Sequence, residues 1–333
     1  MRILTSLNSY QRDSSKPLIL GLGNFDGVHL GHQSLIRYVV AQAKKKNGLS
    51  ALLTFAEHPQ EILHPGQQPK LLTSMLHRLW LFSEMGVDLV FVLHFTEKFS
   101  QVSARQFVEM NLVHQLGVSE VCLGYNAHFG RGREGDGIMM KKLSQEFGFD
   151  FREMDSVRVD GEVVSSTVIR NSISEGELRK AASLLERPFS VVAKVIKGDG
   201  RGKELGFPTA NLDIAGLLLP PFGVYPVLAR EVVFPELSAE SSTNFNVTYS
   251  NKWSYGVLNY GKRPTFGQDG ALAAETHLLD FKGDMYGKHL QILFYPRLRS
   301  EKQFASAEEL KAQIILDIED AKKALIEAKV TQK

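Results

Sequence analysis

Short, unbroken apolar runs alternate with segments of helical period through the first half of the chain. The runs occupy residues 18–23, 51–55, 88–95 and 120–124. Runs of this length without polar interruption predict strands that are buried on both faces. Between the first two runs, apolar side chains from Leu35 to Ala43 recur at helical spacing. Strands that alternate with helices predict an α/β fold with a parallel sheet and right-handed crossovers.

The pattern changes after the helical segment 175–186. Arg187 is followed by Pro188, which cannot continue a helix and favours extended geometry in the residue before it. We therefore place a boundary here and predict two domains, residues 1–186 and 187–333. A chain of 333 residues has room for two domains of about 150 residues each.

The second domain has strands that follow one another closely, with turn residues between them. These strands are expected within residues 190–198, 222–234, 252–261, 275–281 and 289–296. Strands without intervening helices predict an antiparallel β-barrel or sandwich. Apolar residues from Leu310 to Leu325 mark one face of a closing C-terminal helix. The polar segment 235–252 is expected to be an extended hairpin loop.

Charge and composition give no sign of a nucleic-acid-binding or membrane protein. The 39 basic and 37 acidic side chains leave a formal charge of +2, too little to recruit nucleic acid or an anionic membrane. The sequence contains no apolar run of about 18 residues that could span a bilayer. The lone Cys122 suits a reducing compartment and is expected to be a small core residue. We therefore expect a cytoplasmic protein that binds neither nucleic acid nor membrane.

The densest motif is GNFDGVHLGH, residues 23–32, which follows the first predicted strand and precedes a helix. Parallel sheets bind ligands at this edge. Glycines let backbone amides approach a phosphate, and the helix start adds unpaired N–H groups and a positive dipole. We therefore assign an anion site to the residues that begin the motif, Gly23, Asn24, Phe25 and Asp26.

His29 and His32 are three residues apart, so both project from one face if a helix begins beside them. Imidazole donors at that place could stabilise negative charge that develops on a phosphorus-bound oxygen. The alternative is structural, with His29 capping the turn and His32 packing on the sheet. The preceding strand, the glycines and Asp26 favour the catalytic interpretation.

Two later segments carry groups that suit a nucleotide. In SSTVIR, the hydroxyls of Ser166 and Thr167 and the guanidinium of Arg170 converge at a predicted helix start, which suits a triphosphate. The alternative for the hydroxyls is a helix cap. In the glycine-rich loop 123–136, the amide of Asn126 could bind a base or a ribose. The charged residues of that loop could equally form a solvated turn.

A second glycine-rich stretch, residues 197–212, follows the boundary. Its glycines, among them Gly200, make a loop that is suited to covering phosphates. Thr209 and Asn211 alternate across one apolar residue, so both face the same way in an extended chain. Their oxygens suit a hard cation such as Mg²⁺, bound together with nucleotide phosphates. The alternative is a turn at an edge strand with an asparagine cap.

The motifs of the first half resemble those of a known family. GNFDGVHLGH resembles the HxGH signature of nucleotidyltransferases, in particular of the adenylyltransferase module of bacterial bifunctional riboflavin kinase/FAD synthetases. TFAEHP at 54–59, the loop 123–136 and SSTVIR resemble later motifs of that module. The resemblance implies a Rossmann-like nucleotidyltransferase domain in which His29, His32 and Arg170 act in catalysis. At 126–128, Asn, Ala and His replace the family's usual Asp, Phe and Arg.

The second half resembles riboflavin kinase. GRGKELGFPTANL resembles that enzyme's signature, and the segments FGVYPV, NYGKRPTF, ETHLLDF and MYG follow in the family's order. The resemblance implies that Glu275 is the general base and that either Lys203 or Arg201 approaches phosphate. It also implies Mg²⁺ in both domains and riboflavin, FMN and ATP as ligands. The residues that contact flavin and the oligomeric state are left open.

Taken together, the two resemblances imply phosphorylation of riboflavin to FMN, followed by adenylylation of FMN to FAD with release of pyrophosphate. Two alternatives stay open. One is a monofunctional riboflavin kinase with a degenerate N-terminal domain, which the Ala-His-Phe substitution at 127–129 favours and the intact His29, His32, Ser166 and Arg170 oppose. The other is a non-catalytic flavin-binding regulator, which would have no need of Glu275 as a base.

Overall fold

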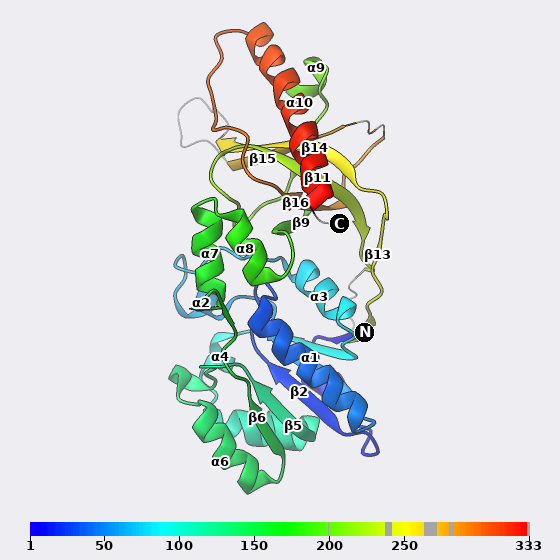
Figure 1. Cartoon of the computed structure of the whole chain (residues 1–333). Coiled ribbons are helices and arrows are strands. Elements are labelled where there is room, and N and C mark those ends of the chain that lie inside the picture. The colour runs from blue at the N-terminus through cyan, green and yellow to red at the C-terminus, as the bar shows by residue number, and fades with distance from the viewer. Residues whose placement is uncertain (199, 237–241, 263–271, 280, 282, 332–333) are drawn as a thin grey trace. The chain divides into compact units, whose positions relative to one another are not determined.

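The computed structural model describes residues 1–198, 200–236, 242–262, 272–279, 281 and 283–331, and the chain forms two compact units (Figure 1). The first unit comprises Met1–Lys70, Met75–Ser165 and Phe234–Asn246. The second comprises Leu71–Ser74, Ser166–Val233 and Val247–Lys333. Residues 166–186 thus group with the second unit by their contacts, whereas the sequence analysis assigns them to the first domain.

The first unit is built on a seven-stranded sheet in the order β12-β1-β4-β3-β2-β5-β6. Its strands are β1 (Arg2–Leu4), β2 (Leu18–Leu22), β3 (Leu49–Phe55), β4 (Leu89–Leu93), β5 (Val118–Leu123), β6 (Asp150–Glu153) and β12 (Ser242–Asn244). All neighbouring strands are parallel except β12, which pairs antiparallel with β1. The predicted parallel α/β fold is confirmed, and the four predicted strands are β2, β3, β4 and β5.

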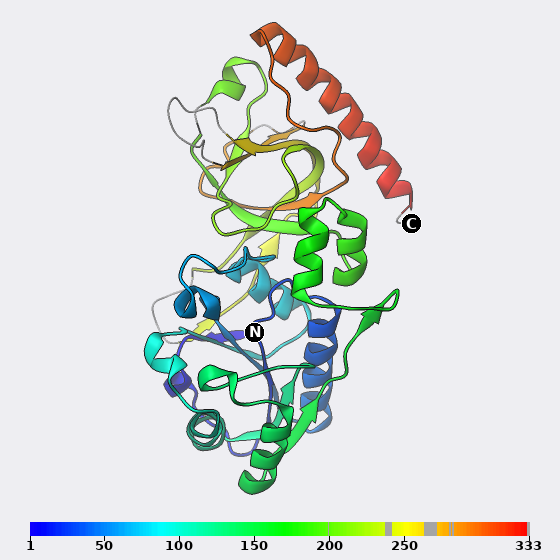
Figure 2. The ribbon, with the colours of Figure 1, turned by 90° about the vertical axis from the view of Figure 1, so that its left-hand side faces the viewer.

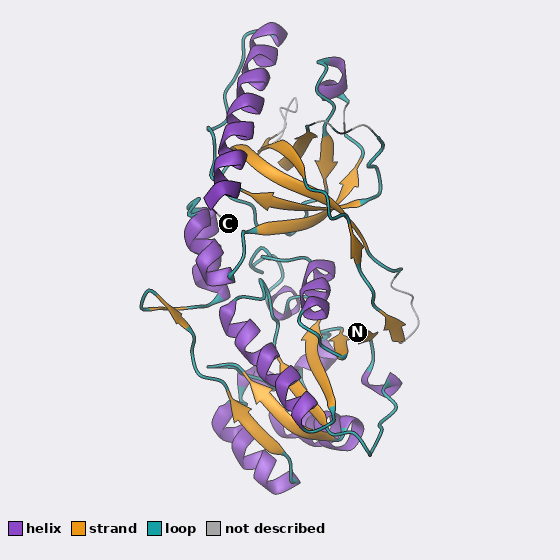
Figure 3. Ribbon diagram, turned by 45° about the vertical axis from the view of Figure 1, so that its right-hand side comes forward, coloured by secondary structure: helices purple, strands orange, loops and turns teal. Residues whose placement is uncertain are grey.

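Helices cover both faces of this sheet (Figure 3). The helical elements are η1 (Leu7–Ser9), α1 (Leu30–Lys45), α2 (Pro59–Leu63), α3 (Met75–Glu84), α4 (Glu97–Ser100), α5 (Ala104–Gln106), η2 (Phe107–Leu116), η3 (Arg131–Arg133) and α6 (Gly137–Phe147). The element η2 has π-helical hydrogen bonding, which is rare. A short two-stranded ribbon, β7 (Arg158–Val159) with β8 (Glu162–Val163), follows β6 in this unit.

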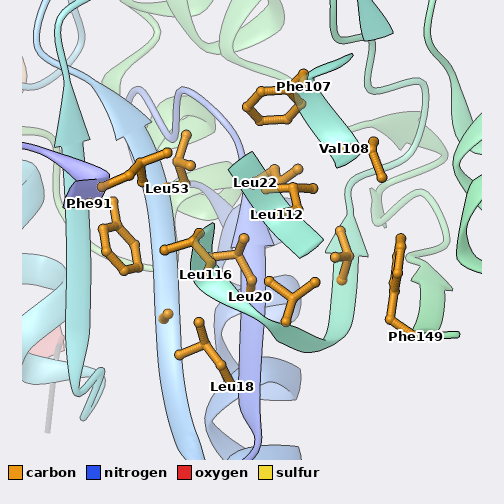
Figure 4. Close-up of a cluster of buried hydrophobic side chains, with 14 of the residues drawn as sticks. Leu18, Leu20, Leu22, Leu53, Phe91, Phe107, Val108, Leu112, Leu116 and Phe149 are labelled. Carbon is orange, nitrogen blue, oxygen red and sulfur yellow. The ribbon is translucent and has the colours of Figure 1, made fainter. Parts of the chain in front are cut away.

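The central strand β2 is buried along its whole length. Successive side chains of a strand point to opposite faces, and Leu18, Leu20 and Leu22 share the face covered by Leu112 and Leu116 of η2 (Figure 4). Full burial of each such leucine stabilises the fold by about 1.5–3 kcal/mol. On the other face, a Cβ at Gly21 would lie 2.6 Å from a methyl group of Leu35 in α1, so glycine permits the close approach of that helix.

A polar network centres on Glu120, a buried residue of strand β5. The carboxylate of Glu120 accepts hydrogen bonds from the Tyr38 hydroxyl at 2.8 Å and from Lys46 at 2.9 Å, and Lys46 also bonds Asp150. Two residues further along the same strand, Cys122 is fully buried, and burial raises the pKa of its thiol. The prediction that Cys122 is a core residue is therefore confirmed.

The second unit is an antiparallel barrel (Figure 2). Its strands are β9 (Ser190–Ile196), β10 (Ala210–Leu212), β11 (Gly223–Val233), β13 (Thr248–Tyr249), β14 (Ser254–Lys262), β15 (Leu272–Leu278) and β16 (His289–Phe294). Their order is β13-β11-β14-β15-β10-β9-β16, and β11 pairs with β16 as well as with β14. This extra pairing closes six of the strands into a barrel, while β13 pairs only with β11. Of the two predicted alternatives, barrel and sandwich, the barrel is confirmed.

Four helices of the described residues accompany the barrel. They are α7 (Ser166–Ser174), α8 (Leu178–Leu185), α9 (Arg201–Glu204) and α10 (Ala307–Thr331). The predicted closing helix is confirmed as α10, whose Ala321 and Leu325 are fully buried against the barrel. The helix predicted at 175–186 is shorter than expected, because Gly176 adopts a φ of 82° between α7 and α8. No described helix is long and apolar enough to cross a membrane.

The segment 235–252 differs from the expected polar hairpin loop. Residues 237–241 lie outside the described residues, but β12 and β13 form strands on either side of residues 245–247. Phe245 is 2% exposed, and its N–H donates to the Met1 carbonyl at 2.9 Å. Phe245 thus packs into the first unit from within a polar stretch, while β12 pairs with β1.

Candidate active sites

In the first unit, the topology brings two predicted segments together. The strand order reverses at β2, which lies between β3 and β5, and open α/β sheets bind ligands where the order reverses. Leu22 at the end of β2 pairs with Leu123 at the end of β5. The motif 23–32 and the glycine-rich loop 123–136 therefore leave the sheet side by side. We call residues 23–28 the anion turn.

The anion turn has an unusual backbone. Phe25 has a φ of 52°, Gly27 of 82° and Val28 of 40°. Positive φ is costly for residues with a side chain, above all for a β-branched valine, and such strain concentrates at functional sites. Phe25 and Asp26 are nevertheless buried, and the Gln33 amide donates to the Val28 carbonyl at 3.0 Å. The surrounding structure therefore holds the turn in this conformation.

The histidines of the motif stack on each other. The helix α1 begins at Leu30, so His29 is its N-cap and accepts the His32 N–H at Nδ1, 3.3 Å away. The two rings are 3.6 Å apart between centroids and 17° from parallel. Because Nδ1 of His29 accepts, Nε2 carries the proton in the neutral ring. His29 thus caps the helix, and its ring also shares one face of the helix start with the ring of His32. Both features were predicted, as parts of alternative interpretations.

The loop after β5 is organised by its own side chains. Glu134 accepts the Ala104 N–H at 2.8 Å, and Asp136 accepts the Met139 N–H at 2.8 Å and caps α6. Asn126 is exposed and left-handed, with a φ of 56°, a conformation that asparagine tolerates better than most residues. Glu134 and Asp136 thus stabilise the loop and the start of α6 through hydrogen bonds to the main chain. Asn126, near the start of the loop, is exposed to solvent.

Sequence reasoning missed an aromatic group in the first unit. Its rings are half-buried or buried and touch mostly edge to face, with centroids 5.1 Å to 6.2 Å apart. The group consists of Phe55, Phe95, Phe99, Phe107 and Phe129. Phe55 ends β3 and Phe95 follows β4, so part of the group lies at the carboxyl edge of the sheet. The signal that could have revealed it is the phenylalanine that ends each of two apolar runs, Phe55 and Phe95.

The SSTVIR segment starts a helix, as predicted. Helix α7 begins at Ser166, so Ser166 and Thr167 lie in its first turn and Arg170 one turn later. Ser166 and Arg170 are half-buried and Thr167 is exposed. These three residues belong to the second unit, and the structure does not place them relative to the anion turn.

In the barrel, strand register aligns three polar side chains. Asn211 in β10 lies opposite Glu275 in β15, and Glu275 lies opposite Asn259 in β14. Residues directly opposite each other in antiparallel strands share a face of the sheet. We call Asn211, Glu275 and Asn259 the polar row. Asn211 is 6% exposed, Glu275 is half-buried and Asn259 is exposed, so the row opens outward from Asn211.

The predicted phosphate loop folds back toward this row. A Cβ at Gly198 would lie 2.1 Å from the Asn211 amide, and a Cβ at Gly202 would lie 3.1 Å from the Thr209 hydroxyl. His277 bonds the Pro208 carbonyl through Nδ1 at 2.8 Å and so holds the end of the loop. Glycines thus permit the loop to pack directly on the two predicted metal ligands.

The oxygens near this loop fit a hard cation. Thr209 offers a hydroxyl, Asn211 an amide oxygen and Glu275 a carboxylate, and oxygen ligands of this kind suit Mg²⁺. Among the described residues, no group of three or more His, Cys, Asp or Glu side chains is arranged to hold a metal ion. Gly200 has a φ of 78°, while the side chain of Lys203 and residues 263–266 lie outside the described part of the chain.

Family models match both units. The model described as FAD synthetase matches residues 11–168, and the one described as riboflavin kinase matches residues 185–325. A protein from Streptococcus pneumoniae named as a macrolide-efflux protein has a similar solved structure, with a TM-score of 0.77 and 24% identity. That likeness covers 96% of this chain and 98% of the other, and it supports the fold alone.

Curated relatives match nearly the whole chain, and they carry the name bifunctional riboflavin kinase/FMN adenylyltransferase. The protein of Escherichia coli K12 is 33% identical, with 95% of this chain and 96% of the relative covered. Those of Haemophilus influenzae and Pseudomonas fluorescens are 35% and 34% identical, with 91% and 97% of this chain and 92% and 97% of the relatives covered. The predicted resemblance is confirmed, and the chain belongs to the family of bifunctional riboflavin kinase/FMN adenylyltransferases.

Proposed function

We propose that the chain makes FMN and then FAD. The second unit transfers the γ-phosphate of ATP to riboflavin, which gives FMN and ADP. The first unit transfers AMP from another ATP to FMN, which gives FAD and pyrophosphate. The observation that carries this proposal is that each unit holds its own arrangement of reactive groups, the stacked histidines at the start of α1 and the polar row of the barrel.

In the barrel, Glu275 accepts the proton of the riboflavin hydroxyl as that oxygen attacks the γ-phosphorus and the bond to the β-phosphate breaks. Phosphoryl transfer depends mainly on positioning and on charge stabilisation, so a single carboxylate within reach of the hydroxyl is sufficient as a base. The loop with Gly200 covers the phosphates, and Lys203 approaches them. The close packing of this glycine-rich loop on Asn211 supports the arrangement.

Thr209 and Asn211 would hold Mg²⁺ together with the phosphates of ATP in the barrel. The cation supplies neutralisation of phosphate charge when it is bound. The oxygen donors described above support this assignment, and the lack of an acidic cage in the described residues agrees with a metal that is held partly by nucleotide. We extend the Mg²⁺ requirement to adenylylation, where ATP phosphates again carry the charge.

In the first unit, Gly23, Asn24, Phe25 and Asp26 form the turn that binds ATP phosphate, with His29 and His32 as donors beside it. A proton on Nε2 of His29 can stabilise charge on the α-phosphate as the FMN phosphate attacks and pyrophosphate leaves. We assign Ser166, Thr167 and Arg170 to the triphosphate and Asn126 to the ribose or base. The aromatic group, with rings at the carboxyl edge of the sheet, offers an apolar surface for the flavin ring.

Three further statements stay predictions. We place the boundary between the catalytic domains at residue 186, and the family matches, which end at 168 and resume at 185, support a boundary in this interval. We expect a cytoplasmic location, which a buried free Cys122 supports. We also expect that neither nucleic acid nor membrane is a partner, given the small net charge.

The first test is incubation of the purified chain with riboflavin, ATP and Mg²⁺, followed by chromatographic separation of the flavins over time. FMN followed by FAD supports both assignments. FMN alone favours the monofunctional kinase, to which the substitution at 127–129 points. If neither product forms, the enzyme assignment is wrong and a flavin-binding regulator becomes the better hypothesis.

A further inference from the structure

A buried arginine bonds the anion turn from outside the motif. Arg78 in α3 is 4% exposed, and its Nη1 donates to the Asn24 carbonyl at 2.7 Å. Thr54 near the end of β3 is fully buried and donates to the same oxygen at 3.2 Å. Two donors from separate elements thus hold one carbonyl, directly before the positive φ of Phe25.

The same arginine balances a buried charge. Asp26 lies 2% exposed in the anion turn, and its carboxylate interacts electrostatically with the Arg78 guanidinium. Burial lowers the pKa of Arg78 and Asp26 raises it, but an arginine stays protonated near neutral pH. Without this cation, the negative charge of Asp26 would be less well compensated and would repel an incoming triphosphate more strongly.

A gain in folding stability does not explain why the Arg78 side chain is buried. Its Nε finds no hydrogen-bond partner among the described residues, so the guanidinium gives up solvation for one hydrogen bond and one opposite charge. Apolar residues often replace buried ion pairs without loss of stability. The contacts of Arg78 instead converge on a strained turn, where a fixed backbone is required for the amides to point at an anion.

We propose that Arg78 is a positioning residue for FMN adenylylation. It fixes the Asn24 carbonyl and neutralises Asp26, so that the anion turn is ready to receive the phosphates of ATP. Arg78 acts through the turn and is not assigned a contact with substrate. The inference rests on the proposed function of the first unit and adds to it a residue that lies outside the recognised motifs.

The test compares Arg78→Met, which removes the charge at similar length, with Arg78→Lys, which keeps it. Arg105→Met is the matched control, because Arg105 is an arginine of the same unit with 49% of its side chain exposed. For each full-length variant, the ATP dependence of FAD formation from supplied FMN is measured. FMN formation from riboflavin is measured on the same preparation.

For Arg78→Met, kcat/KM for ATP in adenylylation should fall about 10- to 100-fold, mainly through KM, because ground-state binding of the triphosphate weakens. Arg78→Lys should recover most of the loss. Arg105→Met, and riboflavin phosphorylation in all variants, should stay within about twofold of the parent. A purely structural role would instead lower kcat and the amount of active protein without changing KM.

Folding is checked with the intrinsic fluorescence of Trp80. The chain has two tryptophans, and in a Trp253→Phe background only Trp80, 3% exposed in α3, reports on the first unit. Native Trp80 emission with an unchanged KM in Arg78→Met overturns the inference. If Arg78→Met loses native emission, Arg78→Gln, which also removes the charge but keeps a polar side chain, decides by the same criterion. If the parent chain makes no FAD, the proposed function is wrong. If the parent makes FAD and removal of the Arg78 charge leaves KM for ATP unchanged, only the role of Arg78 is wrong.

Discussion

The two candidate sites place their reactive groups by different means. In the first unit, the groups lie on turns after parallel strands, and the backbone is bent to positive φ at Phe25 and Val28. In the second, strand pairing aligns Glu275 with Asn211 and Asn259. A turn keeps its shape only through contacts from outside it, whereas register is held by a ladder of main-chain hydrogen bonds. Distant contacts should therefore matter more to the first site than to the second.

The largest effect is expected for Glu275→Gln. Loss of a general base should reduce FMN formation about 10²- to 10⁴-fold, because the hydroxyl proton has no acceptor. Adenylylation of supplied FMN should stay within about twofold. Steady-state rates of both reactions on one preparation provide the measurement. Glu231→Gln is the control, a carboxylate of the same barrel that pairs with Lys288. Loss of both activities in Glu275→Gln would contradict separate sites.

Replacing the stacked histidines should give the reverse pattern. His29→Ala combined with His32→Ala should lower adenylylation about 10²- to 10³-fold, the cost of removing donors that stabilise a developing charge. Riboflavin phosphorylation should be unaffected. The exposed His114→Ala, in η2 of the same unit, controls for loss of a histidine. Normal FAD formation by the double variant would refute the assigned role of the start of α1.

Phe245→Ala tests whether the segment between β11 and β14 belongs energetically to the first unit. Phe245 is 2% exposed, so truncation should destabilise its unit by about 3–5 kcal/mol. Adenylylation should therefore be lost at a lower temperature than kinase activity. Residual activities after heating measure the difference. Thr248→Ala, at an exposed position in β13, should not change the temperature at which either activity is lost. Equal loss of both activities in Phe245→Ala would mean that the segment does not stabilise the first unit selectively.

The smallest effect concerns alkaline pH. Burial and the bond to Glu120 raise the pKa of Tyr38 from 10.0 to about 12. Bonds to Asp150 and Glu120 raise that of Lys46 from 10.5 to about 12 against the effect of burial. Both groups bind their protons more tightly in the folded state. Their contribution to stability is therefore fully present below about pH 10 and is lost as the pH rises toward 12.

Urea unfolding of the first unit, followed through Trp80, should show this fall in the free energy of unfolding across the alkaline range. Glu120→Gln should flatten the dependence, because it removes the carboxylate that both groups share. Glu109→Gln, on the same unit but with 37% of its side chain exposed, serves as the control. A slope that Glu120→Gln leaves unchanged would assign the alkaline loss of stability to other groups.

Several elements of the fold followed from local patterns. The unbroken apolar runs became β2 to β5, and the helix predicted after the GNFDGVHLGH motif begins at Leu30. The terminal helix also lies where apolar spacing placed it. The helix predicted at 175–186 begins later, at Leu178, because Gly176 has a positive φ and separates α7 from α8. Periodicity does not report such a break, since it depends on the backbone conformation of one residue.

Other features depended on partners far away in the chain. Glu275 was assigned through family resemblance, and its alignment with Asn211 became visible only from the register of β10 and β15. The aromatic group combines phenylalanines from β3, η2 and three loops or short helices. Arg78 carries no motif at all. Its neighbours in the sequence give no sign that its guanidinium reaches Asn24.

The sequence by itself determined the class of each unit, the place of the anion turn and the candidate ligands Thr209 and Asn211, because strand period, helix period and turn chemistry act over a few residues. Tertiary structure alone decided that the barrel closes through β11 and β16, that β12 extends the first sheet, and that Arg78 holds Asn24. Such pairings join residues whose sequence separation leaves no local pattern. They are selected by burial and by hydrogen bonding across the whole fold.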